Sequence, residues 1–165
     1  MAHSNPLDIL LIHNHWANRK IIQVCIPLTP EQFHRTFEMG RGSVHNTIAH
    51  ILGAMRSWND MLNGREPGPR VEAGPQRTCD ELLALLEEIT ADLNATARSH
   101  PLDEIVSAVR GGKKYTLTRG GVLTHVTTHG MHHRAQCLNM LRQLGVSPLP
   151  APGVIDWIVA EDMAG

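Results

Sequence analysis

The sequence predicts an all-α protein, a bundle of four long helices with a small extended excursion before the last one. Three observations favour this class: apolar residues recur at helical spacing, capping residues precede these stretches, and segments rich in glycine and proline separate them. The chain has 165 residues, which suits a single domain over residues 1–165 with one substantial core.

The first helix is expected from about Pro6 to Cys25. Ser4 or Asn5 can cap its first turn, where a proline is well tolerated, and another proline two residues after its end stops it. A turn that opens a brief helix is expected over residues 29–33.

The second and third helices have clear start signals. Ser43 is the expected N-cap of the second helix, which ends at a connection rich in glycine and proline over residues 63–75. Thr78 and Glu81 have the spacing of a capping box, so they mark the start of the third helix, which ends before Pro101.

The last third of the chain changes its rhythm before it becomes helical again. Residues 102–119 hold two short β-like runs around a Gly-Gly pair, which predicts a small hairpin. The fourth helix is expected from Gly120 or Gly121 to Gly145, a C-terminal glycine cap. The tail around Trp157 is expected to add a short packing helix.

Composition and charge argue against several classes of protein. The formal net charge is −1 with neutral histidines, and the sequence has no basic stripe of the kind that nucleic-acid-binding domains carry. The N-terminal segment lacks the pattern of a signal peptide, and no run approaches the ~20 apolar residues of a membrane span. Cys25, Cys79 and Cys137 form no CxxC pair, so we expect buried reduced thiols and a cytoplasmic location.

Histidine is the unusual residue of this chain, with 11 copies against two phenylalanines and one tyrosine. Four of them, His125, His129, His132 and His133, share one face of the fourth helix over about two turns. Histidines at i and i+4 can chelate one ion, although the glutamate of an HExxH zinc helix is absent because Gly130 follows His129. A solvated polar face is the alternative interpretation. This helix is rich in apolar residues, however, and buried imidazoles need partners, which a shared metal ion supplies.

A third ligand has to come from another helix, because one helix cannot surround an ion. His50 is the better candidate, since it lies within the apolar stripe of the second helix. His45, in the first turn of the same helix, points ~140° away from His50 and is expected to be exposed. His13 and His15 on the first helix are alternatives, which we interpret as structural or surface residues.

Three further residues are candidates for the surroundings of such a site. Arg134 has the planar fork that recognises carboxylates, although pairing with a nearby acidic side chain is the more frequent role. Trp58 and Trp16 are candidate pocket walls, and core packing is the more frequent role for each of them.

Three segments of the chain resemble the motifs of DinB/YfiT-like metalloproteins, which are four-helix bundles. Residues 123–136 resemble their late-helix signature, in which a His is followed, after three residues, by His-Arg-Gly-Gln; Ala135 stands in place of this glycine here. Residues 43–51 resemble their second-helix motif, and residues 14–18 resemble the start of their first helix.

This resemblance implies a ligand set and an up-and-down bundle with unusual connectivity, often dimeric. His50, His129 and His133 would bind the metal, which selects His133 over His132, a choice that spacing alone leaves open. His125 and His132 would then orient the ligands or line a pocket. A homodimer is therefore expected.

Three neutral imidazoles with an open fourth position form the pattern of a catalytic zinc site, and Zn²⁺ and Ni²⁺ both suit imidazole. Such an ion activates bound water or a thiol and polarises carbonyls. The resembled group includes S-transferases and isomerases that use low-molecular-weight thiols, which implies a metal-dependent transferase or hydrolase acting on a small molecule. The sequence assigns no catalytic residue. The alternative is a non-catalytic, stress-related bundle that binds a metal or small ligand, with a fourth protein ligand such as His125 closing the site.

Overall fold

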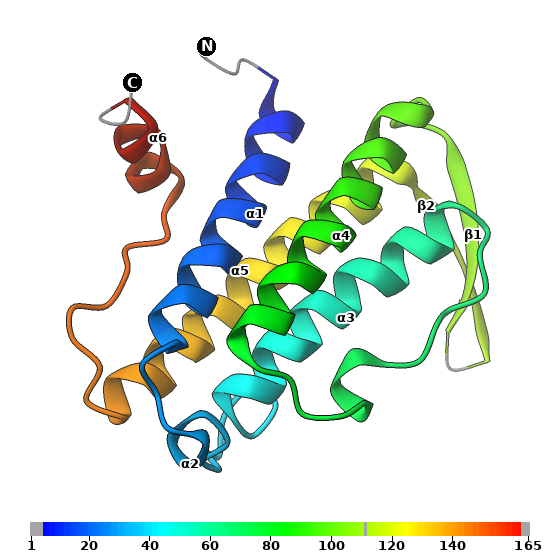
Figure 1. Ribbon diagram of the computed structural model, residues 1–165. Coiled ribbons are helices and arrows are strands. Elements are labelled where there is room, and N and C mark those ends of the chain that lie inside the picture. The colour runs from blue at the N-terminus through cyan, green and yellow to red at the C-terminus, as the bar shows by residue number, and fades with distance from the viewer. Residues whose placement is uncertain (1–4, 111, 163–165) are drawn as a thin grey trace.

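The computed structural model describes residues 5–110 and 112–162, and it consists of a bundle of helices with a two-stranded hairpin beside it (Figure 1). The predicted all-α class, with an extended excursion before the last long helix, is confirmed. In chain order, the elements are α1 (Pro6–Cys25), α2 (Pro30–Phe33), α3 (Val44–Leu62), the 3₁₀ turn η1 (Val71–Ala73), α4 (Cys79–Ser99), β1 (Ile105–Arg110), β2 (Lys113–Thr118), α5 (Arg119–Gln143) and α6 (Val154–Asp162).

Side-chain caps fix the starts of α1 and α3 where the sequence predicts them. The Oδ1 atom of Asn5 accepts a hydrogen bond of 2.9 Å from the backbone N–H of Leu7. Ser4, the other candidate cap, lies outside the described residues. The Oγ atom of Ser43 accepts one of 3.0 Å from the N–H of Asn46. Both caps satisfy donors that the first turn of a helix leaves unpaired.

The starts of α4 and α5 are capped in the same way. Thr78 and Glu81 form the predicted capping box, in which each side chain accepts from the other residue's backbone N–H. The Oγ1 atom of Thr118 accepts from the N–H of Gly121, so α5 begins at Arg119, slightly before the glycines at which the sequence analysis placed its start.

The four long helices form a ring of neighbours in which α1 and α3 each pack against α4 and α5. Arg119, at the start of α5, donates hydrogen bonds to the carbonyls of Leu62 at 2.8 Å and Thr96 at 3.1 Å. Because Leu62 ends α3 and Thr96 lies near the end of α4, these two helices run in the same direction and α5 runs against them. Arg98 in the last turn of α4 pairs with Asp8 in the first turn of α1, so α1 also runs against α4.

This parallel arrangement of α3 and α4 gives the bundle its unusual connectivity. The chain between them, residues 63–78, has to return along the length of α3 before α4 can begin. The 3₁₀ turn η1 lies on this return path and packs against α3. The crossover therefore adds a short layer outside α3, next to the residues that form the candidate site.

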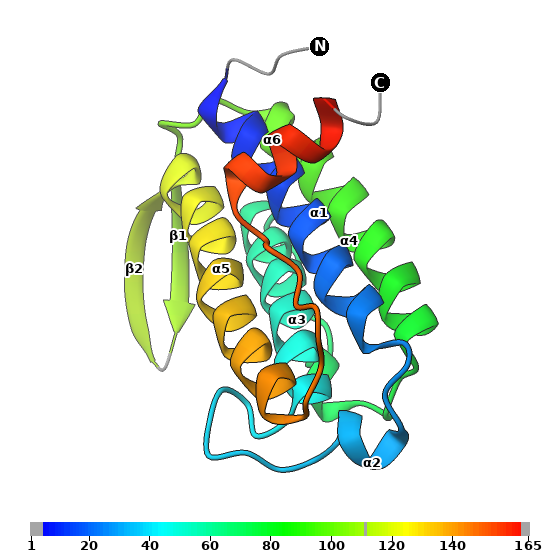
Figure 2. The ribbon, with the colours of Figure 1, turned by 90° about the vertical axis from the view of Figure 1, so that its left-hand side faces the viewer.

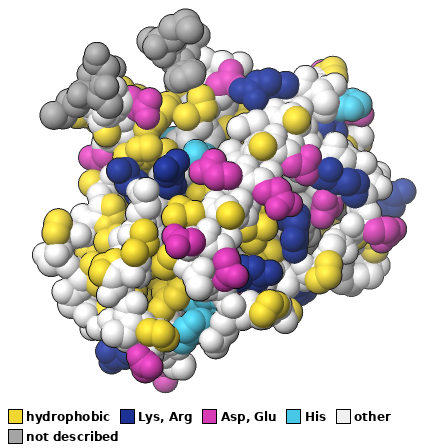
Figure 3. Space-filling model, viewed as in Figure 1, with side chains coloured by type: hydrophobic (Ala, Val, Ile, Leu, Met, Phe, Trp, Pro, Cys, Tyr) yellow, Lys and Arg dark blue, Asp and Glu magenta, His cyan; other side chains and the backbone are white. Residues whose placement is uncertain are grey.

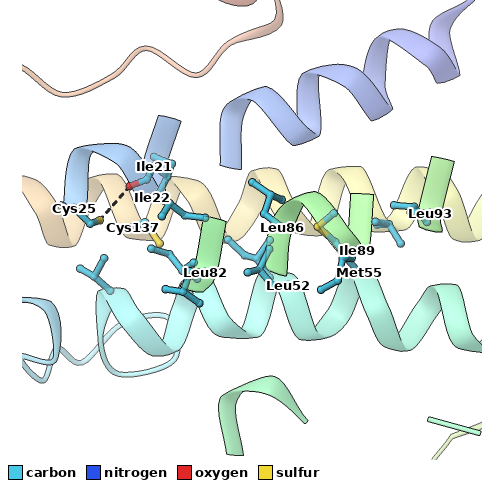
Figure 4. Close-up of a cluster of buried hydrophobic side chains, with 14 of the residues drawn as sticks. Ile21, Ile22, Cys25, Leu52, Met55, Leu82, Leu86, Ile89, Leu93 and Cys137 are labelled. Atoms are coloured by element: carbon cyan, nitrogen blue, oxygen red, sulfur yellow. Dashed lines mark hydrogen bonds between the residues drawn. The ribbon is translucent and has the colours of Figure 1, made fainter. Parts of the chain in front are cut away.

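The core lies where the four long helices meet, and each of them contributes fully buried aliphatic side chains (Figure 4). Burial of one such side chain is worth about 1.5–3 kcal/mol. Cys25 and Cys137 are buried in this core, and burial raises the pKa of both thiols, that of Cys137 to about 12. Both cysteines therefore remain protonated and unreactive near neutral pH, as predicted, whereas Cys79 is only partly buried.

The predicted hairpin is present as an antiparallel pair of strands beside α5 (Figure 2). Val106 and Leu117 face each other across the pair and pack against the edge of the core. Gly112 has a φ of +75°, which a glycine adopts without strain in the tight turn. After Gly145 ends α5 with a φ of +81°, α6 packs on α1 through the buried Trp157, as the sequence predicts.

The surface seen in Figure 3 carries acidic and basic side chains interspersed with each other. Within residues 5–110 and 112–162, no helix has the length and apolarity needed to cross a membrane.

Candidate metal centre

Three imidazoles from two helices come together on the side of the bundle where α3 packs against α5. They belong to His50 on α3 and to His129 and His133 on α5, and their nearest ligand atoms all lie within 4.8 Å of one another. The ring centroids are 5.1 Å apart for His50 and His129, 4.7 Å for His50 and His133, and 4.5 Å for His129 and His133. The structure thus brings together the three residues that the sequence analysis selected.

The helices themselves explain this convergence. His129 and His133 lie one turn apart on α5, so their side chains project from the same face. His50 comes from the antiparallel neighbour α3, and all three side chains are half-buried. Nitrogen ligands of a tetrahedral zinc ion with bonds of ~2.1 Å lie ~3.4 Å apart. Small side-chain rotations would close the present spacing to that value, so the donor set fits a divalent ion.

The crossover between α3 and α4 provides an acidic partner for His50. The Oε1 atom of Glu72, on η1, lies 3.0 Å from Nδ1 of His50, and both side chains are largely buried. Burial, the largest single influence, acts to raise the pKa of the Glu72 carboxyl group, but the hydrogen bond from His50, a backbone hydrogen bond and nearby positive charges together lower it. A carboxylate accepts this hydrogen bond from Nδ1–H, which leaves the lone pair of Nε2 available for a metal ion.

Gly53 makes the close approach of Glu72 to α3 achievable. A Cβ atom at this position would lie 2.8 Å from Oε2 of Glu72 and 3.3 Å from Cβ of Val71. Any larger residue would push η1 outward or turn the carboxylate away from His50. The glycine in the middle of α3 therefore serves the site, although glycine costs a helix interior about 1 kcal/mol relative to alanine.

Gln136 holds the ring of His133 in a similar way. Its Oε1 atom lies 2.7 Å from Nδ1 of His133, and its Nε2 atom lies 3.1 Å from Nε2 of His132. The amide oxygen can only accept and the amide nitrogen can only donate, so His133 donates from Nδ1 and His132 accepts at Nε2. The Nε2 atom of His133 is thereby left free to bind a metal ion, as in His50.

The imidazoles favour their neutral forms, which are the forms that bind metal. Burial and, after it, the neighbouring histidines, His133 first among them, together lower the pKa of His129 to about 4. Burial also lowers the pKa of His133, although the hydrogen bond to Gln136 opposes this shift. Protons therefore compete weakly for these two side chains at neutral pH.

His125 on α5 and Trp58 on α3 extend the cluster of rings along the contact between the two helices. The ring of His125 lies 5.5 Å from that of His129 and 5.1 Å from that of Trp58, measured between centroids. The described residues add no fourth His, Cys, Asp or Glu atom to the group of three, so His125 does not close it. His125 and Trp58 thus border the site, and the described residues supply three ligand atoms to it.

The remaining histidine candidates lie elsewhere, and one prediction about them is wrong. His45 is buried, with 3% of its surface exposed, because the chain before α4 covers it: the N–H of Arg77 donates to its Nε2 atom, and its Nδ1 atom bonds to Asn46. His13 donates to the carbonyl of Pro152, so it is structural, as predicted. His15 pairs with Glu87 at 2.9 Å on the outside of the bundle.

Arg134 does not pair with an acidic side chain, contrary to the favoured prediction. It is buried between α1 and α5, where its Nη1 atom donates to the amide oxygens of Asn14 at 2.7 Å and Asn18 at 3.1 Å. Burial lowers its pKa to about 10, so it remains charged. Gly130 allows this contact, since a Cβ there would lie 2.6 Å from Oδ1 of Asn14. The guanidinium group of Arg134 therefore connects α1 to α5. It is buried away from solvent, so it is not placed to bind a small molecule at the three imidazoles.

Trp16 also lies away from the cluster. The ammonium group of Lys20 sits over its ring at 5.7 Å, and the ring of His13 is 6.2 Å away. Trp58 is therefore the tryptophan that borders the site, and Trp16 belongs to the surface of α1.

Fold and site together define a helical-bundle protein with three convergent histidines that could hold a metal ion. The model of the DinB family matches residues 1–160, so the chain belongs to the DinB family. Two proteins of Bacillus subtilis (strain 168) are similar to it. The protein DinB is 24% identical over 149 residues, which cover 84% of this chain and 86% of that protein. The uncharacterized protein YizA is 27% identical over 131 residues, which cover 77% of this chain and 80% of that protein.

Sequence reasoning missed the two residues that orient the ligands. Gln136 carries a usable signal, because it lies three residues after His133 on the same helix. Glu72 carries none in its own segment, which is rich in glycine and proline and lies 22 residues from His50. The only hint is Gly53, an unexplained glycine in an otherwise regular helix.

Proposed function

We propose that this protein is a divalent-metal-dependent enzyme that acts on a small molecule, as a thiol-dependent S-transferase or a hydrolase. The observation that carries the proposal is the group of three half-buried imidazoles, His50, His129 and His133, with no fourth protein ligand among the residues described. Structural zinc sites are usually closed by four protein ligands, whereas catalytic sites keep one position for water or substrate.

The side chains around the cluster support this assignment. Glu72 and Gln136 orient His50 and His133 so that Nε2 of each carries the free lone pair. Such outer hydrogen bonds hold ligand rings in place and are worth about 10–100-fold in metal affinity or activity. Imidazole donors suit Zn²⁺ and Ni²⁺, which we propose as the ion. When bound, the ion would lower the pKa of a coordinated thiol or water molecule.

A catalytic role can be tested with reagents that do not presuppose the natural substrate. The protein loaded with zinc or nickel is assayed for conjugation of cysteine to 1-chloro-2,4-dinitrobenzene and for hydrolysis of p-nitrophenyl acetate. We expect turnover that disappears on removal of the metal and in the His129→Ala variant. Turnover that is equal with and without metal, or metal-loaded protein with no turnover of any thiol or ester, would favour a non-catalytic metal-binding bundle.

We also propose that the chain forms a homodimer, as the resemblance of its motifs implies. Light scattering coupled to size-exclusion chromatography measures the mass directly. A mass of one chain across the micromolar range would refute this part of the proposal.

A further inference from the structure

Arg41 lies in a tight loop that is tied to the start of α3. The glycines on either side of it, Gly40 and Gly42, have φ values of +59° and +87°, and the N–H of Phe37 bonds to the carbonyl of Gly42 at 2.8 Å. The N–H of Arg41 itself donates to Oγ1 of Thr47 at 3.1 Å. The backbone of Arg41 is therefore fixed relative to the helix that carries His50.

The same loop contacts the hydrogen-bond partner of His133. A Cβ atom on Gly40 would lie 3.1 Å from Oε1 of Gln136, the atom that accepts from Nδ1 of His133, and 2.8 Å from Oγ1 of Thr47. Only a residue without a side chain fits between α3 and α5 at this point. Arg41 thus directly follows Gly40, which lies against the residue that bonds to His133. Figure 2 shows the loop passing beside the start of α3 and the end of α5.

The side chain of Arg41 begins beside the imidazole cluster. Its backbone N–H is bonded to Thr47 on α3, and the residue before it, Gly40, lies against Gln136, the hydrogen-bond partner of His133. The Arg41 side chain is exposed, and no carboxylate of the described chain lies within ion-pair distance of it. Glu72 is engaged by His50 and forms no ion pair with Arg41.

We propose that Arg41 is the anion-binding part of the site and that the small molecule carries a carboxylate beside its metal-binding atom. This inference rests on the proposed function, because it assumes that the ligand binds at the three imidazoles. A single guanidinium fork matches the two oxygens of one carboxylate, and it has no competing acidic partner here. Arg134, which the sequence analysis offered for this role, is buried between α1 and α5.

Three small thiols that differ in charge provide the test. The protein is loaded with Co²⁺, and binding of mercaptoacetate, 2-mercaptoethanol and cysteamine is followed by the thiolate-to-cobalt absorption, with each affinity corrected for the ionisation of its thiol. We expect mercaptoacetate to bind roughly two- to fivefold more tightly than 2-mercaptoethanol, the range of an exposed ion pair. Cysteamine should bind most weakly, and high salt should reduce the differences.

Variants separate the role of Arg41 from that of the metal. Arg41→Gln should abolish the preference for mercaptoacetate and leave the affinity for 2-mercaptoethanol unchanged, while Arg41→Lys should keep part of the preference. Arg35→Gln is the matched control, because Arg35 lies in the same connection but sits 5.2 Å from the ring of Phe37. Equal preference in wild type and Arg41→Gln, or no preference in wild type, would refute the inference and leave the proposed function standing. A protein that takes up no Co²⁺, or binds none of the thiols, would refute both.

Discussion

The carboxylate of Glu72 lies 3.0 Å from Nδ1 of His50, although the two residues are 22 positions apart in the chain. The contact exists because α3 and α4 run in the same direction, so the connection between them has to pass back along α3. The path that the chain has to take between α3 and α4 therefore places Glu72 beside His50, a candidate metal ligand.

Removing this carboxylate should weaken metal binding without unfolding the protein. Glu72→Ala leaves Nδ1 of His50 without its acceptor, so we expect metal affinity to fall about 10–100-fold. Competition with a chromophoric chelator measures the change. Glu66→Ala, an exposed position in the same connection, should have no effect. If both variants bind metal as tightly as wild type, Glu72 does not orient His50.

Adding one methyl group at Gly53 should also disturb the contact between Glu72 and His50, in this case by displacing the carboxylate. In Gly53→Ala, the new Cβ would meet Oε2 of Glu72 and Cβ of Val71, so the carboxylate has to move. The gain in helix propensity, about 1 kcal/mol, should offset most of the crowding. We therefore expect weaker metal binding with little change in the urea midpoint, whereas Ser57→Ala on the exposed face of α3 should leave metal affinity unchanged. Unchanged affinity in Gly53→Ala would show that η1 is not held as described.

The metal-free protein should lose stability as the pH falls from 7.5 to 5.0. Burial lowers the pKa of His13, His45, His129 and His133 in the folded chain, that of His129 to about 4. The unfolded chain, with histidine pKa values near 6.5, binds more protons in this range, so acid favours unfolding. Each such group contributes at most about 1.4 kcal/mol per pH unit.

Urea denaturation at the two pH values measures this effect. The midpoint should be lower at pH 5.0, and the drop should be smaller in His129→Gln, which removes one of the proton-linked groups. A midpoint that stays constant or rises on acidification would contradict the pKa shifts.

The ligands of the candidate site were more predictable than their surroundings. Spacing on one helix indicates His129 and leaves His132 and His133 as alternatives, between which the resemblance to known motifs selects His133. His50 follows from its place in an apolar stripe. His45 was wrongly expected to be exposed, because its cover comes from Phe33 and Arg77, on segments whose path no periodicity reveals. The direction of α4 relative to α3 could not be predicted for the same reason. Local capping signals fix the residue at which a helix starts, but not its direction relative to other helices.

Buried polar contacts were the other feature that spacing did not reveal. Arg134 bonds to two asparagine amides on α1, at separations of 120 and 116 residues, and not to an acidic residue. These contacts require a close approach of α1 to α5, which is possible because Gly130 has no side chain.

Metal analysis combined with X-ray absorption tests the central claim most directly, namely that imidazoles from α3 and α5 bind one cation. We expect one ion per chain, with three imidazole nitrogens at ~2.0–2.1 Å for zinc, and a marked loss of metal in His50→Ala and His129→Ala. His100→Ala, at an exposed position after α4, should retain the full metal content. Equal metal content in all three variants, or an absorption spectrum without imidazole ligands, would contradict it.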